Sequence, residues 1–314
     1  MLNLFKTLFM KNRSWIFVSV SLVALFLVFI SASDAYFDAA AEPTPKHSEP
    51  SIKVPPTLTF AGEKVPIEYF DVRESLEREL ISNMYFHSQT IVLLKKADRY
   101  LSVIEPLLER YCIPKDFKYL AVAESILNDK AMSPAGAAGI WQIMKATAQE
   151  YGLEVNSNVD ERYNFELSTH AACKYLLESY EKFENWTLVA ASYNMGRHAV
   201  DRSMEYQKQD DYYDMYLNTE TARYVFRILA FKLILENPKG YGFNISPKDK
   251  YPVFKFDTIH VNYPIDHLAD FAKENGMNYK TLKIFNPWFL ENKLNNASKK
   301  PYKILKPQEG YRTK

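Results

Sequence analysis

The sequence has almost no charge imbalance and very few cysteines. Its 39 Lys and Arg residues are matched by 38 Asp and Glu residues, which leaves a formal net charge of +1. A polycation that binds nucleic acid is therefore excluded. Cys112 and Cys173 are isolated, with no CxxC pair and no nearby pair of histidines. This argues against a metal site and against thiol catalysis. Both cysteines fall in predicted helices, and their spacing leaves open whether they form a disulfide.

A basic and then apolar stretch opens the chain. Three basic residues between positions 6 and 13 precede a predominantly apolar run, residues 15–30. This is the pattern of an export signal, and its positive flank places the N-terminus in the cytoplasm. No cysteine follows the run, so a lipoprotein anchor is not supported. We predict that residues 1–33 are a signal peptide or a membrane anchor, and small residues at 31–33 leave cleavage open.

The remaining chain divides by composition into three parts. Residues 34–62 hold five prolines among small and charged residues, which predicts an extended tether. Residues 63–245 show helical periodicity, and residues 250–314 mix strand and helix patterns. An apolar content of 47% over 314 residues suits about two packed domains.

The helical part is organised around residues 121–144. Phe117, Leu120, Ala121 and Glu124 recur at the spacing of one helical face. A carboxyl group in line with apolar residues loses hydration, which raises its pKa. That is the property a general acid needs near neutral pH. The alternative interpretation is that Glu124 is a solvated glutamate at a helix end, since charged residues are mostly exposed.

A loop of small residues follows this helix. It contains Ser133 and Gly139, and small residues let the backbone approach a ligand closely. Trp141 and Gln142 then supply an apolar plate and an amide that both donates and accepts hydrogen bonds. Together these residues predict a site for a sugar ring.

The whole run resembles the catalytic segment of the soluble lytic transglycosylase family. That family carries a Glu-Ser pair and then the pattern Ala-x-Ser-Pro-x-Gly-Ala-x-Gly-x-Trp-Gln-Phe-Met. The pair is present here as Glu124 and Ser125, and Ile143 stands where Phe is usual. The other matching positions are Ala131, Ser133, Pro134, Gly136, Ala137, Gly139, Trp141, Gln142 and Met144.

Three later segments extend the resemblance. An Asp-Glu-Arg motif stands at residues 160–162. Tyr193, Asn194 and Gly196 match the family pattern Ala-Tyr-Asn-Ala-Gly, in which the amide faces an N-acetyl group. Residues 220–225 resemble Glu-Thr-x-x-Tyr-Val, whose tyrosine hydroxyl lies near the catalytic carboxyl. The resemblance therefore implies that Tyr224 orients Glu124, against the alternative of an ordinary core tyrosine.

The C-terminal part reads as a small βααβ unit. Alternation predicts strands at 254–261 and 302–305, with helices at 266–275 and 279–285 between them. This order resembles the LysM glycan-binding module. Residues 263–265 replace the usual Gly-Asp-Thr turn, so glycan binding by this unit is less firmly implied than its fold, and a cap on the enzyme domain is the alternative.

The predicted fold class is mainly α, with a lysozyme-like all-α catalytic domain at 63–245 and an α+β, LysM-like domain at 250–314. The resemblance implies a peptidoglycan lytic transglycosylase of the bacterial envelope, with glycan strands as partner and the membrane as a second partner if residues 15–30 are retained. Glu124 is the implied catalytic residue, and no metal or cofactor is required. The implied substrate-binding residues are Ser125, Ser133, Gly139, Trp141, Gln142, Tyr193, Asn194 and Tyr224.

Glycosidases normally use two carboxyl groups, and the sequence offers no persuasive second one. Asp129 is the nearest, and we expect it to be solvated, while Asp160 and Glu161 read as a helix start. A single carboxyl suffices if the C6 hydroxyl of N-acetylmuramic acid is the nucleophile. Two alternatives stay open: a hydrolytic muramidase similar to goose-type lysozymes, and a cell-wall binding protein without catalysis.

Overall fold

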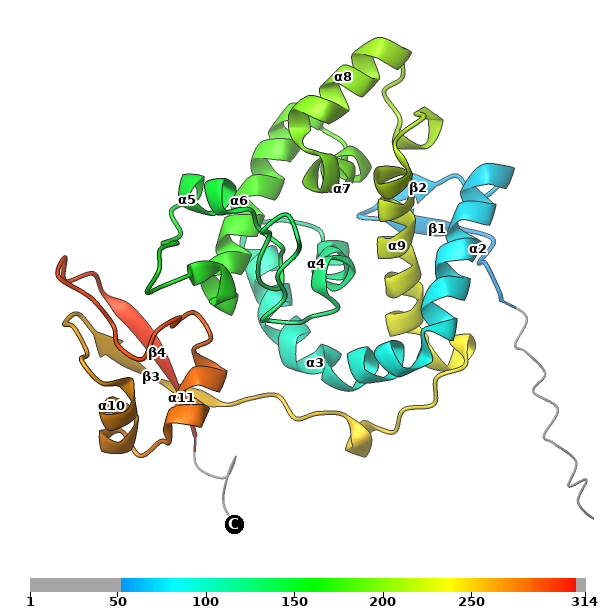
Figure 1. The fold of residues 1–314 in the computed structure, drawn as a ribbon. Coiled ribbons are helices and arrows are strands. Elements are labelled where there is room, and N and C mark those ends of the chain that lie inside the picture. The colour runs from blue at the N-terminus through cyan, green and yellow to red at the C-terminus, as the bar shows by residue number, and fades with distance from the viewer. Residues whose placement is uncertain (1–51, 309–314) are drawn as a thin grey trace, which may run out of the picture. The chain divides into compact units, whose positions relative to one another are not determined.

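The structure, a computed structural model, describes residues 52–308. Within them the chain folds into a helical body followed by a small α+β unit (Figure 1). The helices are α2 (Phe70–Tyr85), α3 (His87–Arg110), α4 (Lys118–Ser125), α5 (Lys145–Glu150), α6 (Phe165–Phe183), α7 (Trp186–Met195), α8 (Arg197–Gln207), α9 (Thr219–Glu236), α10 (Leu268–Glu274) and α11 (Tyr279–Phe285).

The strands within residues 52–308 form two antiparallel pairs. β1 (Leu58–Phe60) pairs with β2 (Glu63–Val65), and β3 (Phe256–Val261) pairs with β4 (Tyr302–Pro307). Short 3-10 turns connect other elements: η1 (Lys115–Phe117), η2 (Glu161–Tyr163), η3 (Tyr212–Asp214), η4 (Pro238–Tyr241) and η5 (Pro247–Asp249). The predicted fold class, a mainly helical domain with a small α+β unit, is confirmed.

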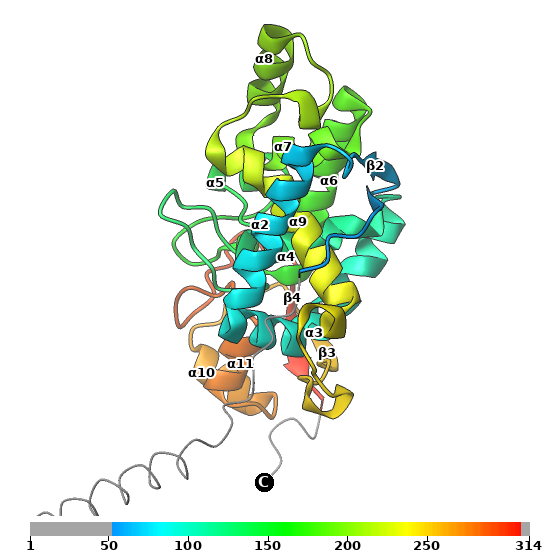
Figure 2. The ribbon, with the colours of Figure 1, turned by 90° about the vertical axis from the view of Figure 1, so that its right-hand side faces the viewer.

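Helix α4 lies inside the helical body. It packs against α3 and α9, and α9 lies alongside α2 (Figures 1 and 2). Phe117, Leu120 and Ala121 have no exposed surface, as their spacing predicts. A helix of eight residues is too short to be stable alone. Burial of its apolar face, worth about 1.5–3 kcal/mol for each large side chain, therefore fixes where α4 lies.

The predicted tether, residues 34–62, includes residues that are folded into the helical body. Residues 34–51 lie outside the described part, but Leu58 and Phe60 of β1 are buried in the core of the helical body. In β2, the Glu63 carboxylate accepts hydrogen bonds from the Thr187 amide (2.9 Å) and hydroxyl (2.7 Å) at the start of α7. An anion there satisfies amides that have no partner within the helix. The hairpin thus belongs to the helical body.

The C-terminal unit has the predicted βααβ order. In the β3–β4 pair Phe256 lies opposite Pro307 and Val261 opposite Tyr302. Helices α10 and α11 pack together, and α11 also packs on β4 (Figure 1). The unit has a hydrophobic core of its own, whose members include Val261, Leu268 and Ile304.

Most expected helices are present with small shifts at their ends, but two features were not anticipated. Helix α8 was missed, because Val200 is its one buried residue and so no apolar stripe marks it. Cys112 follows α3 and does not lie in a helix; it is exposed, whereas Cys173 in α6 is buried. Both thiols are free, so they do not form a disulfide in this structure.

The predicted export segment, residues 1–33, lies outside the described residues. Across residues 52–308, none of the helices has the length and apolar character needed to span a membrane.

Candidate active site

Glu124 stands in the last turn of α4, one residue before the helix ends. The chain leaves the helix through Ile126 and Leu127, whose φ angles of 51° and 53° are left-handed. A β-branched residue adopts that conformation only when its surroundings impose it. Such strain clusters at functional sites, and here it turns the backbone sharply from the helix into the loop of residues 131–143.

The carboxyl group of Glu124 is desolvated although the residue is partly exposed. Burial raises the pKa of this carboxyl from 4.5 to about 7, which is the largest effect on it. The Tyr224 hydroxyl of α9 donates a hydrogen bond to Oε1 of Glu124 and partly opposes this rise in pKa. Arg227 lowers the same pKa and Glu220 raises it through their charges. A group that titrates near 7 exchanges protons readily at neutral pH.

A second tyrosine lies near this carboxyl. Tyr193 at the end of α7 donates to the carbonyl of Trp141 at 2.8 Å. Burial raises the pKa of Tyr193, and the negative charge of Glu124 raises it further. The same two causes, in the same order, raise the pKa of Tyr224. Both hydroxyls therefore stay protonated, and each donates its single proton, Tyr224 to Glu124 and Tyr193 to the Trp141 carbonyl.

The loop of residues 131–143 is held by its own hydrogen bonds. Ser133 pairs with Ala137 through its amide (2.9 Å), and its Oγ accepts from the Ala137 amide at 3.0 Å. Nε2 of Gln142 donates to the carbonyls of Gly139 (2.8 Å) and Ala131 (3.3 Å). Ser125 connects the loop to the helix, since its Oγ donates to the Ile140 carbonyl at 2.9 Å.

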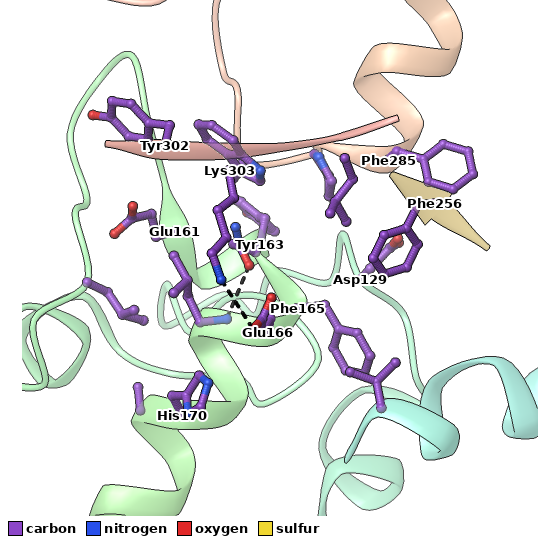
Figure 3. A pocket seen from close by; sticks show the side chains of 18 of the residues that line it. Asp129, Glu161, Tyr163, Phe165, Glu166, His170, Phe256, Phe285, Tyr302 and Lys303 are labelled. Carbon is purple, nitrogen blue, oxygen red and sulfur yellow. Dashed lines mark hydrogen bonds and ion pairs between the residues drawn. The ribbon is translucent and has the colours of Figure 1, made fainter. Parts of the chain in front are cut away.

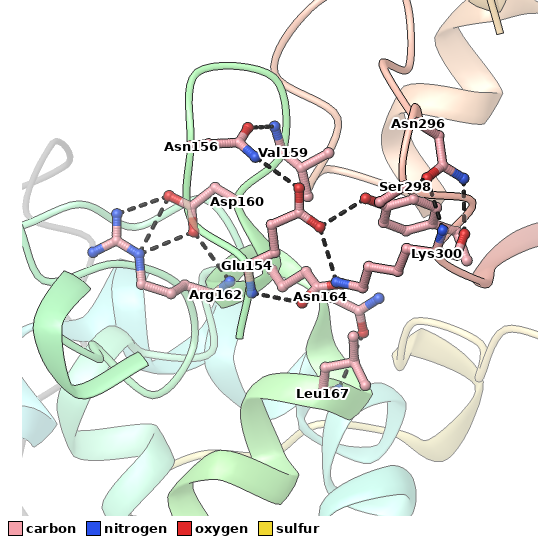
Figure 4. A network of polar contacts seen from close by, with 12 residues as sticks. Glu154, Asn156, Val159, Asp160, Arg162, Asn164, Leu167, Asn296, Ser298 and Lys300 are labelled. Carbon is pink, nitrogen blue, oxygen red and sulfur yellow. Dashed lines mark hydrogen bonds and ion pairs between the residues drawn. The ribbon is translucent and has the colours of Figure 1, made fainter. Parts of the chain in front are cut away.

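Arg162 holds the same loop from outside. Its Nη1 donates to the carbonyls of Gly136 (2.7 Å) and Ile143 (3.1 Å), while Nε and Nη2 bind the Asp160 carboxylate (Figure 4). The predicted helix start at 160–162 is present as η2, with Asp160 as its cap. The hold of Arg162 on the loop was not foreseen, because no local pattern connects positions 136 and 162.

The other carboxyl groups stand apart from Glu124. Asp129 was expected to be solvated, but it is half-buried and burial raises its pKa. It lines a cavity of about 500 Å³ that is walled by aromatic side chains such as Phe165 and Phe285 (Figure 3). Glu124 does not line this cavity. Glu220, whose charge reaches Glu124, is largely exposed and pairs with Arg227 at 3.3 Å.

Two family models match this chain. Residues 103–216 match the Transglycosylase SLT domain, and residues 257–310 match the Soluble lytic transglycosylase C-terminal LysM-like domain. The chain carries an SLT domain and a LysM-like domain. Glu124, the loop and Asn194 lie inside the SLT match, whereas Tyr224 lies beyond its end.

Several of the sequence relatives are lytic murein transglycosylases. Membrane-bound lytic murein transglycosylase D of Escherichia coli (strain K12) is 30% identical over 235 residues, which are 72% of this chain and 50% of the relative. Membrane-bound lytic murein transglycosylase F of Cronobacter sakazakii is 30% identical over 130 residues, 38% of this chain and 24% of the relative. The chain thus spans about half the length of the first of these relatives.

Two solved structures are similar over part of the chain. One is an inactive variant of the lytic transglycosylase Slt from Pseudomonas aeruginosa, at 17% identity and a TM-score of 0.37, covering 50% of this chain and 27% of that one. The other is a 70 kDa soluble lytic transglycosylase from Escherichia coli, at 24% identity and a TM-score of 0.35, covering 43% and 24%. These scores are too low to transfer any geometry.

Two residues of the SLT domain that were predicted to contact substrate are buried in this structure. Trp141 was expected to offer a plate to a sugar ring, but it has no exposed surface and its Nε1 donates to the Thr169 hydroxyl at 2.9 Å. Gly139 was expected to let a ligand approach, but it is buried. A Cβ there would lie 2.1 Å from the Arg162 carbonyl oxygen. Both residues serve the packing of the loop.

Asn194 and Gln142, two other predicted site residues of the SLT domain, each have a polar atom with no hydrogen-bond partner among the described residues. Oδ1 of Asn194 accepts from the Thr221 hydroxyl at 2.8 Å, while its Nδ2 donates to none of the described residues. The Oε1 atom of Gln142 likewise accepts from none of them. Both residues are partly exposed, so these atoms are available to a ligand.

Proposed function

We propose that this chain is a peptidoglycan lytic transglycosylase with Glu124 as its catalytic residue. It cleaves the β-1,4 bond between N-acetylmuramic acid and N-acetylglucosamine and leaves a 1,6-anhydro end. The proposal rests chiefly on the environment of Glu124, a desolvated carboxyl with a pKa of about 7 that is oriented by Tyr224 inside an SLT domain. The names of the relatives support the same reaction class.

The chemistry needs one carboxyl group in two protonation states. Protonated Glu124 first donates its proton to the glycosidic oxygen as the bond from C1 to that oxygen breaks. The resulting carboxylate then accepts the proton of the C6 hydroxyl, whose oxygen bonds to C1 of the same sugar. No water is consumed, and Glu124 ends protonated again. Intramolecular attack of this kind gains from proximity.

The neighbouring groups take supporting roles in this proposal. Tyr224 holds Oε1 of Glu124 and leaves Oε2 to face the glycosidic oxygen. Nδ2 of Asn194 and Oε1 of Gln142 bind the sugar or its N-acetyl group. The supporting role of Tyr193, Ser125 and Ser133 is indirect. Their hydrogen bonds hold the helix end and the loop, and the backbone of these segments then positions the substrate.

A hydrolytic muramidase is the second candidate, and one observation favours it. Glu220 is the carboxylate whose negative charge acts on Glu124. In an inverting glycosidase a second carboxylate activates water, and Glu220 is the residue for that role. Its large exposure and its pairing with Arg227 are ordinary for a surface residue, so we place it second.

We place the enzyme at the bacterial cell envelope, with glycan strands as its partner. Residues 1–33 export the chain and, if retained, residues 15–30 hold it at the membrane. The domain division we propose is an SLT domain that begins at about residue 54, earlier than the predicted 63, and ends near 245, followed by the LysM-like domain. The earlier start follows from the burial of Val54, Leu58 and Phe60 in the helical core.

The test is digestion of purified peptidoglycan sacculi by the full-length chain, with mass analysis of the released muropeptides. We expect 1,6-anhydro products from the wild type and none from Glu124→Gln, which keeps the size of the side chain and removes the acid. Glu220→Gln should still give anhydro products. Hydrated products that disappear in Glu220→Gln would establish the hydrolase. If a folded wild type binds sacculi without releasing products, the chain is a binding protein.

A further inference from the structure

Residues 154–162, here called the bridging segment, belong to the SLT domain by sequence yet complete the core of the LysM-like domain. Val159 has no exposed surface and packs among the core residues of the LysM-like domain. Val159 also forms an antiparallel bridge with Phe289. On either side of it the Asp160 amide donates to the Trp288 carbonyl (3.0 Å), and the Asn158 carbonyl accepts from the Leu290 amide (3.0 Å).

Side chains fasten the bridging segment to the LysM-like domain at two further places. The buried Asn158 donates through Nδ2 to the Lys293 carbonyl (2.8 Å) and accepts through Oδ1 from the Asn295 amide (2.8 Å). Lys300 reaches the Glu161 carboxylate at 2.6 Å. It also reaches the Glu154 carboxylate at 2.9 Å (Figure 4). Glu161 is 3% exposed, so its charge depends on Lys300 for a partner.

On its other side the bridging segment carries Arg162, whose side chain is 6% exposed. Each of its three nitrogens donates a hydrogen bond, Nε and Nη2 to Asp160 and Nη1 to the carbonyls of Gly136 and Ile143. The backbone carbonyl of Arg162 also lies directly against Gly139. Arg162 therefore contacts the loop of residues 131–143 at three positions, Gly136, Gly139 and Ile143.

This loop is bonded to two residues that lie beside Glu124. The Ile140 carbonyl accepts from Ser125, the residue that follows Glu124, and the Trp141 carbonyl accepts from Tyr193. A continuous set of contacts thus runs from Lys300 through Glu161 and Arg162 to the catalytic helix end.

We propose that Arg162 is a positioning residue for Glu124, and that the LysM-like domain holds Arg162 in place through the bridging segment. The LysM-like domain would then be part of the catalytic framework, whatever it does with glycan. The loop has no helix and little sheet pairing of its own, so anchors of this kind determine how well it is ordered. Small displacements of a catalytic group lower the rate strongly. The catalytic part of this proposal rests on the function proposed above; the structural part does not.

The test uses full-length variants that loosen the bridging segment without touching the SLT loop. Lys300→Met removes the cation from Glu161, and Asn158→Ala removes two hydrogen bonds to the LysM-like domain. Lys300→Arg keeps the charge. Lys303→Met is the matched control, because Lys303 forms a weaker contact with the exposed Glu166 of α6 (3.8 Å) and not with the bridging segment.

Two measurements apply to each variant. Hydrogen exchange at the amides of Gly139 and Ile143, which are bonded within the loop, reports order without any need for activity. The dependence of kcat on pH, measured on soluble glycan strands, reports the hydration of Glu124, because access of water lowers its pKa.

We expect Lys300→Met and Asn158→Ala to speed exchange in the loop, to lower kcat by about tenfold with little change in KM, and to move the alkaline limb of kcat to lower pH. Lys300→Arg and Lys303→Met should resemble the wild type. Unchanged exchange in folded Lys300→Met and Asn158→Ala would overturn the proposal. Faster exchange with unchanged kcat and pH profile would overturn its catalytic part. If the wild type itself is inactive, the proposed function has failed, and the exchange result still decides the structural part.

Discussion

The Tyr224 hydroxyl donates a hydrogen bond to Oε1 of Glu124, although the two residues are 100 positions apart in the chain. Helix α9 brings the hydroxyl to α4, and Tyr224 is buried in the helical core. The bond stabilises the carboxylate, so it opposes the effect of burial on the pKa of Glu124. Burial is the stronger of the two, which leaves this pKa at about 7.

Removal of that hydroxyl should slow the reaction and shift its pH dependence. In Tyr224→Phe we expect the pKa of Glu124 to rise further, because the hydrogen bond that lowers it is lost. A general acid stops working as the pH rises through its pKa, so the alkaline limb of kcat should move to higher pH. Loss of a hydrogen bond to a charged group, about 1.5–3 kcal/mol, corresponds to roughly 10–100-fold in kcat. A variant with the wild-type pH profile would contradict this role of Tyr224.

Glu124 should make stability depend on pH. Its pKa is 4.5 ordinarily and about 7 in the fold. Between these values the folded protein holds a proton that the unfolded chain has lost, so stability falls as the pH rises and stays lower above 7. Glu124→Gln lacks this penalty. Denaturant unfolding should find it more stable than the wild type by up to about 3 kcal/mol above pH 7, with little difference below pH 4.5. A difference in unfolding free energy between Glu124→Gln and the wild type that does not change with pH would refute the raised pKa of Glu124.

Alanine substitutions at Gly139 and Gly136 allow a matched comparison within the loop. Both have left-handed φ angles, 76° and 87°. A Cβ on Gly139 would meet the Arg162 carbonyl oxygen at 2.1 Å, whereas a Cβ on Gly136 meets nothing within 4 Å. Gly136→Ala should therefore cost about 1–2 kcal/mol for the left-handed backbone alone. Gly139→Ala should cost about 4 kcal/mol or more, as measured by denaturant unfolding. Equal losses would mean that the loop is free to move away from Arg162.

The two thiols should differ in reactivity. Cys112 is exposed, whereas Cys173 is buried and burial raises the pKa of its thiol to about 12. Since the thiolate is the reactive form, iodoacetamide at pH 8 should label Cys112 and leave Cys173 unlabelled until the protein is denatured. Peptide mass analysis of native and denatured samples checks this. Labelling that requires a reductant would instead reveal a disulfide between them.

Local patterns were informative wherever burial follows the period of an element. The apolar stripes of α3, α6 and α9 lie in the core, and the motif around residue 224 correctly predicted that its tyrosine lies beside Glu124. The β1–β2 hairpin was missed because the prolines around it are typical of a tether. Its place in the core depends on α7 and α9, more than 100 residues away.

Residue types indicated which chemical groups the site region carries, but they did not indicate where those side chains lie in the fold. A tryptophan beside a glutamine in a small-residue loop is a reasonable sugar site, but Trp141 faces Thr169 inside the core. Glu161 lies in the first turn of η2, as predicted, but it also binds Lys300, 139 positions away. Neither partner could be inferred from spacing.

The sequence by itself determined the helices with regular apolar periodicity, the βααβ order of the C-terminal unit and the placement of Glu124 on an apolar helical face. Each of these is encoded by neighbours within a few residues, where spacing and burial coincide. The tertiary structure alone decided which polar atoms of the motif remain for a ligand, as Nδ2 of Asn194 does, and that Arg162 of the bridging segment binds the loop. Those outcomes depend on hydrogen bonds and ion pairs between distant segments, and such partners exist only once the chain has folded.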